Sequence, residues 1–288
     1  MSLSDNASTR RELIIGAAGA ALYATLPGVA AAAAQRSFVP DFADPVDALR
    51  AHVKLAGSLA EETVVSFYRL NIYADLNEGN FVPLYTLNNL LIDKWTPKSN
   101  GSFQMIKYEA GYYTAIDSYD VIETFKHPLT GKMLPVENFR LGPVPRGYDK
   151  DKYIVMGYNP DPLPLEVIGD RVFLATQSIE SGPSFTAPGE TRYTNSFMTY
   201  SATLADMQNP DLACAPVHAQ LQNKTEWSPW MQMGDQPGGT VARGYGSKVS
   251  GLDGLPPGVL EQFGKQTPQI LDIENWKSFV SEATPPSK

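Results

Sequence analysis

Short runs of β-branched and aromatic residues dominate the chain and are separated by turn residues. Residues 63–75 and 81–93 form two such runs, and "LNEGN" between them suits a hairpin turn. Residues 101–117 alternate, with one face carrying Met105, Lys107 and Glu109 and the other Ile106, Tyr108, Ala110 and Tyr112. Further strands are predicted at 118–128, 152–158, 171–178 and 192–203. Such strands favour a β-dominated α+β fold, an antiparallel barrel or sandwich with a few peripheral helices.

Helical spacing marks only a few segments. Asp44 is a good N-cap for a helix that begins at Pro45 and ends near Gly57. Three more helices are predicted at 203–207, 256–263 and 272–283, the last with an apolar stripe of Ile273, Trp276, Phe279 and Val280. The stretches 141–150 and 181–191 are rich in turn residues and are predicted as long loops.

The N-terminal segment has the features of an export leader. Arg10 and Arg11 precede an apolar run, rich in Gly and Ala and interrupted by Pro27, which is poorly suited to span a membrane. We therefore expect a twin-arginine signal peptide over 1–34 and a single β-rich domain over 35–288. This route exports folded proteins, so the expected location is the periplasm and the export machinery an expected partner. A Sec leader or an uncleaved anchor is the alternative.

Charge and composition narrow the classes of function. The formal net charge is −8 and no basic run occurs, which argues against nucleic acid as a partner. The single Cys214 cannot form an internal disulfide. The three histidines show no metal-ligand spacing, and neither a nucleophile elbow nor a dinucleotide fingerprint is present. We expect a protein that needs neither metal nor cofactor. The sequence does not indicate the oligomeric state.

The stretch "WSPWMQMGDQPGG" at 227–239 is the most unusual in the chain. Trp227, Trp230, Met231 and Met233 offer adaptable apolar surface that could bind a flat ligand. We expect a short extended segment here, with both methionines on one side. The alternative is that these side chains close one end of the barrel.

Several polar residues are candidates for proton transfer. Arg69 lies within the predicted strand 63–75 between tyrosines, and Tyr112 and Asp117 lie in the predicted strand 101–117. Asp235 and Arg243 come directly after the tryptophan–methionine stretch. His127, in the turn "KHPLTGK", could act as an acid or base, since histidine titrates near neutrality, and is also a candidate for binding substrate; the alternative is a solvated turn residue. Each carboxylate could equally lie on a solvated strand face.

Three stretches resemble an uncharacterised domain-of-unknown-function family of proteobacteria and fungi, whose members often carry a twin-arginine leader. They are 120–144, with its Pro-x-Thr-Gly turn, 227–239 and 246–256. The chain departs from the family pattern at His127, where Asn is common, which weakens the case for a shared catalytic histidine. The resemblance implies that 227–239 is a defining feature and implies no reaction.

These observations favour an enzyme of acid–base type, a lyase, isomerase or hydrolase, that acts on an apolar, aromatic or terpenoid-like small molecule. Tyr112, Asp117, Arg69, Asp235 and Arg243 would move protons, while the tryptophans and methionines would form a wall. The alternative is a periplasmic protein that binds the same molecules without catalysis.

Overall fold

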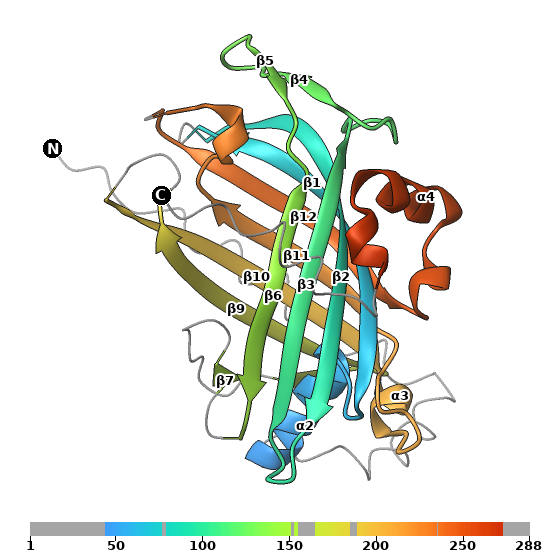
Figure 1. Ribbon diagram of the computed structural model, residues 1–288. Coiled ribbons are helices and arrows are strands. Elements are labelled where there is room, and N and C mark those ends of the chain that lie inside the picture. The colour runs from blue at the N-terminus through green and yellow to red at the C-terminus, as the bar shows by residue number, and fades with distance from the viewer. Residues whose placement is uncertain are drawn as a thin grey trace, which may run out of the picture. The chain divides into compact units, whose positions relative to one another are not determined.

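One large antiparallel sheet forms the body of the protein (Figure 1). The computed structural model describes residues 44–76, 79–150, 153–154, 165–184, 189–234 and 236–272, all within the unit Asp41–Lys288. The ten strands run in the order β7-β6-β3-β2-β1-β12-β11-β10-β9-β8. Their bounds are β1 Glu62–Asp75, β2 Phe81–Pro97, β3 Phe103–Thr114, β6 Phe139–Tyr148, β7 Tyr153–Ile154, β8 Leu165–Ile168, β9 Arg171–Pro183, β10 Thr191–Thr203, β11 His218–Thr225 and β12 Gly239–Val249. A separate hairpin pairs β4 Thr124–Lys126 with β5 Met133–Pro135.

The sheet is curled into a half-barrel. In a flat sheet β10 and β3 would lie five strand spacings apart, roughly 24 Å. Yet the Tyr200 hydroxyl on β10 is close enough to Lys107 on β3 and Arg146 on β6 for both charges to lower its pKa. Curling therefore brings the two sides of the sheet together. The "inner face" below is the side that carries Tyr200 and Lys107, and the "outer face" is the opposite side.

Helix α2, Pro45–Ala56, closes one end of the inner face. The Asp44 carboxylate caps it by accepting from the backbone N–H groups of Val46 and Asp47. Leu49 and Val53 pack with residues of β1, β2, β3 and β6, whereas Ala51 and Leu55 pack with residues of β9 and β10. The helix thus fills the space between the two sides of the curled sheet.

The tryptophan–methionine stretch and the β4–β5 hairpin close the opposite end (Figure 1). Residues Pro229–Met231 form the 3-10 turn η1 and not the extended segment that was predicted. Gln232 then takes a left-handed conformation with φ 52°, so Met231 and Met233 are both buried while Gln232 is exposed. The middle of the inner face lies between these two ends.

The short helices cover other surfaces. Helix α4, Pro257–Gln266, and η3, Pro268–Leu271, pack on the outer face of β1 to β3 with η2, Leu252–Gly254. Helix α3, Leu204–Gln208, begins at Thr203, whose hydroxyl accepts from the Asp206 N–H, and packs near α2. In the part of the chain that the structure describes, no helix is long and apolar enough to cross a membrane.

Several predicted elements are confirmed and others are wrong. The first helix, the strands at 63–75, 81–93, 171–178 and 192–203, and the helices at 203–207 and 256–263 are present. The predicted loop 141–150 is mostly strand β6, and the predicted strand 118–128 is reduced to β4. The helix predicted at 272–283 and most of the strand predicted at 152–158 lie outside the described residues, as do the leader and the middle of the loop predicted at 181–191.

Candidate active site

Ionisable side chains gather on the inner face, between α2 and the tryptophan–methionine end. Asp93 of β2 is paired in register with Lys107 of β3, and Leu91 is paired with Glu109. Because side chains alternate along a strand, Asp93, Lys107 and Glu109 share this face. The Lys107 Nζ lies 3.1 Å from Glu109 Oε1, and both side chains are largely buried. The curled sheet therefore holds a charged cluster in its interior.

The ionisation of Asp93 is strongly disturbed by its surroundings. Burial, together with the negative charge of Glu109, raises its pKa from 3.8 to about 6, although the cations Lys107, Arg146 and Lys248 act in the opposite direction. Its Oδ1 atom is buried and accepts no hydrogen bond from the described residues. Asp93 can therefore exchange a proton near neutral pH, and one of its oxygens is open to a donor from a ligand.

Lys107 and Glu109 form an ion pair that stays charged. Burial lowers the pKa of Lys107, but the nearby carboxylates outweigh burial and raise it. Burial raises the pKa of Glu109, but the charge and hydrogen bond of Lys107 outweigh it and lower this pKa. Asn89 also supports the carboxylate, since its Nδ2 donates to Glu109 Oε2 over 3.4 Å. Of the two carboxyls in this charged cluster, Asp93 is therefore the one poised to change charge near neutrality.

Tyrosine hydroxyls from three strands surround the cluster. They belong to Tyr68 of β1, Tyr148 of β6 and Tyr200 of β10. Burial raises the pKa of all three, that of Tyr200 to about 12, so each remains protonated at neutral pH. The site thus combines Asp93, which can accept a proton, with neutral tyrosine hydroxyls that can donate hydrogen bonds.

A family model described as "Protein of unknown function (DUF1838)" matches residues 61–279. The chain belongs to the DUF1838 family. The matched region includes the inner-face cluster and all three stretches on which the resemblance was based. A search of curated proteins finds no match. Membership in DUF1838 thus gives the family without naming a reaction.

The tryptophan–methionine wall of this DUF1838 chain is part of a packed core. Trp227, Trp230, Met231 and Met233 are buried with Tyr85, Tyr113 and Leu134 in one apolar cluster. The Trp227 Nε1–H donates to the Gln236 carbonyl over 3.2 Å, and the Tyr85 hydroxyl donates to Met231 Sδ over 3.5 Å. These contacts place the four side chains at the end of the half-barrel, and their substrate-binding role stays a prediction.

His127 belongs to the same end and is not a solvated turn residue. Its ring is fully buried, with the Trp227 ring 6.2 Å away, centroid to centroid. Its Nδ1 accepts from the backbone N–H groups of Leu129 and Thr130 at 3.2 and 3.4 Å, and burial lowers its pKa. The neutral ring therefore stabilises the turn after β4.

The predicted proton-transfer residues lie apart from this wall. Arg69 and Tyr112 do lie together, close enough for the Arg69 charge to lower the Tyr112 pKa, but on the outer face beside α4. Burial of Tyr112 against Phe263 is the larger effect and raises that pKa to about 12. Arg243 is exposed on the outer face of β12, and Asp117 is exposed after β3. Asp235 lies outside the described residues.

Sequence reasoning noted the alternation of Met105, Lys107 and Glu109 but did not select these residues. The available signal was a strand with ionisable side chains at alternate positions, beside Asp93 at the end of "NNLLID". Both faces of β3 are covered, the outer one by α4 and the inner one by the curl of the sheet. Alternation alone therefore could not identify the interior face. No group of three His, Cys, Asp or Glu side chains suited to a metal occurs among the described residues.

Proposed function

We propose that the protein is an acid–base enzyme that acts on a small molecule at the inner face of the half-barrel. The observation that carries this proposal is Asp93, a buried carboxyl whose pKa of about 6 lies near neutrality beside a fixed ion pair. Perturbed carboxyls of this kind cluster at sites that transfer protons.

The charged cluster and the tyrosines around it have separate roles in such a reaction. The Asp93 carboxylate would take a proton from carbon or oxygen of the substrate and return it at another position. The hydroxyls of Tyr68 and Tyr200 would donate to an oxygen that gains negative charge in the transition state. Lys107 and Glu109 would keep the local field constant, since neither changes charge near neutral pH.

An apolar substrate with one carbonyl or hydroxyl group fits this environment. The charged cluster is flanked on the inner face by apolar side chains, including Val64, Leu70 and Leu91. Reactions without a cofactor that suit this arrangement are isomerisation, elimination and hydrolysis of aromatic or terpenoid-like carbonyl compounds. We also propose that the protein acts in the periplasm after twin-arginine export.

Proton transfer can be tested before the substrate is known. The full chain is incubated in D₂O with a panel of aromatic and terpenoid ketones and esters, and exchange or conversion is followed by mass spectrometry. We expect deuterium incorporation or turnover by the wild type and a loss of at least about 100-fold in the Asp93→Asn variant. Asp253→Asn, which changes an exposed aspartate in η2, is the matched control and should keep full activity.

The result also separates an enzyme from a binding protein. Ligand-dependent thermal stabilisation without exchange or conversion would favour a non-catalytic carrier. Equal activity of the wild type and Asp93→Asn would reject Asp93 as the proton-transfer group.

A further inference from the structure

The outer face of β10 and β12 presents aromatic side chains to solvent. Tyr245 of β12 is 68% exposed, and Phe197 and Tyr193 of β10 are 49% and 59% exposed. Odd-numbered residues of both strands share this face, since β11 joins them in an unbroken antiparallel register. Exposed aromatic side chains that are grouped on one surface indicate a binding site.

A fourth aromatic ring extends this group across β1. Tyr245 is paired in register with Arg69, and the Tyr119 ring lies over the Arg69 guanidinium, with 3.9 Å between Cζ and the ring centroid. Tyr119 is 76% exposed, and its neighbour Ser118 accepts from Arg69 Nη2 over 3.2 Å. Strand β12 is separated from β10 by two strand spacings, roughly 10 Å. The aromatic side chains therefore form a broad, shallow row and not a single pocket.

Amide side chains lie between the aromatic ones. Gln220 of β11 is paired with Tyr245, and Gln222 is paired with both Phe197 and Arg243. Both glutamines are exposed, and each can donate and accept hydrogen bonds. A ligand that follows this row would meet aromatic faces and amides in alternation.

The row is also cationic, in a chain whose net charge is −8. Arg69 and Arg243 are diagonal neighbours across β1 and β12. Within the described parts of the chain neither arginine forms a salt bridge, and the Arg69 Nη1 atom is buried without a hydrogen-bond partner. Arg243 is exposed, and an exposed guanidinium without an ion pair can bind a carboxylate ligand through two parallel hydrogen bonds, while the Arg69 charge adds to the positive potential beside it.

We propose that this surface, formed by Tyr119, Tyr193, Phe197, Gln220, Gln222, Arg243 and Tyr245, binds an acidic oligosaccharide. Aromatic faces pack on the C–H faces of sugar rings, amides bind hydroxyl groups, and the Arg243 guanidinium pairs with a uronate carboxylate. The surface lies on the opposite side of the sheet from Asp93, so this binding does not depend on the proposed reaction.

Isothermal titration calorimetry with defined probes tests the proposal. The full chain is titrated with a hexamer of β-(1,4)-linked mannuronate and, separately, with a neutral β-(1,4)-glucan hexamer. We expect binding of the mannuronate hexamer that weakens as salt is added, and at least about tenfold weaker binding of the neutral hexamer. Tyr245→Ala and Arg243→Gln should each weaken mannuronate binding about tenfold.

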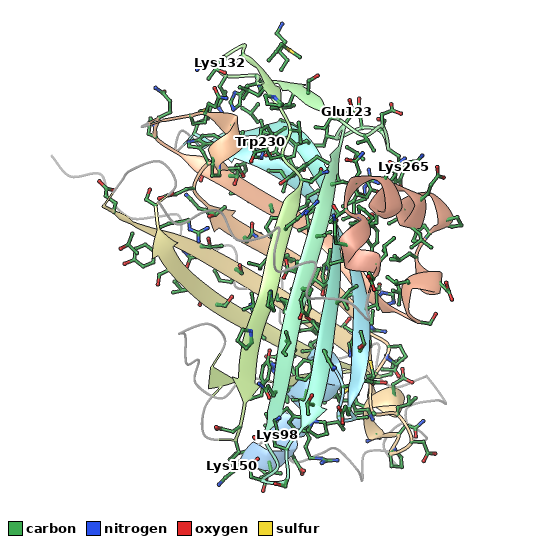
Figure 2. The ribbon with its side chains drawn as sticks, in the orientation of Figure 1. Lys98, Glu123, Lys132, Lys150, Trp230 and Lys265 are labelled. Atoms are coloured by element: carbon green, nitrogen blue, oxygen red, sulfur yellow. The ribbon has the colours of Figure 1, made fainter. Side chains whose placement is uncertain are left out.

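Two controls test whether the loss of mannuronate binding is specific to this surface. Lys98→Gln removes a cation from the turn between β2 and β3, at the α2 end of the sheet (Figure 2), and should leave binding unchanged. Size-exclusion chromatography of the wild type and Tyr245→Ala shows whether a second copy covers the surface. Equal affinity for the neutral hexamer, the absence of mannuronate binding, or a dimer that Tyr245→Ala dissociates would each overturn the proposal.

Discussion

At the scale of single residues, Asp93 combines its proposed catalytic role with a cost to stability. Its carboxyl is buried, and the ionised form lacks the hydration it would have in the unfolded chain. The surrounding cations offset only part of that loss, which is why the pKa stays at about 6. A neutral side chain at this position would make the fold more stable than an ionised carboxylate does.

Replacement of Asp93 by Asn should therefore stabilise the fold, and more so at high pH. Because the folded-state pKa is raised, the protonated carboxyl stabilises the fold fully below pH 3.8, and this contribution is lost as the pH rises through 6. Asn stays neutral, so we expect a gain in the free energy of unfolding of about 3 kcal/mol at pH 8 and almost none at pH 4. Urea unfolding at both pH values measures the difference, and a gain that does not vary with pH would contradict the assignment.

His127 should contribute to stability and not to proton transfer. His127→Ala removes a buried ring and leaves the N–H groups of Leu129 and Thr130 without their acceptor, so we expect a loss of about 3 kcal/mol. Asn can offer its Oδ1 in place of Nδ1, and His127→Asn should lose about half as much. Thermal unfolding compares the two variants. Equal losses would show that the turn hydrogen bonds contribute little.

At the scale of elements, β12 depends on two glycines within the strand. Gly244 and Gly246 lie inside this strand, next to β1. A Cβ at Gly244 would overlap the Arg69 carbonyl oxygen, and one at Gly246 would overlap the Tyr68 ring. The missing side chains therefore allow β12 to approach β1 closely and leave room for the Tyr68 ring.

Gly246→Ala should consequently displace Tyr68. We expect a loss of about 2 kcal/mol in the free energy of unfolding. Gly258→Ala in α4 is the matched control, since a Cβ there meets nothing within 4 Å and a helical alanine should add about 0.5–1 kcal/mol. Chemical denaturation of both variants provides the comparison, and two changes of the same sign would refute the steric explanation.

Local signals predicted α2, β1 and β2 because capping residues and apolar runs determine them within a short window. The local signals were wrong at β6, where Gly142, Pro143 and Pro145 predict a loop although the segment is a strand that pairs with β3. They failed similarly for the site. Asp93, Lys107 and Glu109 come together through strand pairing, but only the curl of the sheet, set by contacts far apart in sequence, makes their face an interior.

At the scale of the whole molecule, Arg10 and Arg11 of the predicted leader allow a direct test of export. We expect replacement of both Arg10 and Arg11 by lysine to keep the protein in the cytoplasm, because the twin-arginine machinery recognises the arginine pair. Fractionation of cells that express the two forms measures this. Unchanged export of the lysine form would favour a Sec leader.

The pairing of β1 with β12 has a consequence for when the chain can fold. The two strands pair at the centre of the sheet, from Val65 opposite Val249 to Asp75 opposite Gly239, although most of the chain separates them in sequence. A ribosome must therefore synthesise nearly the whole chain before β1 can pair with β12. Contacts between residues so far apart in sequence slow folding. Folding is thus expected to be post-translational and slow, so that the nascent chain would depend on chaperones for protection from aggregation. The predicted twin-arginine route, which exports proteins only after they have folded, would allow time for this slow folding.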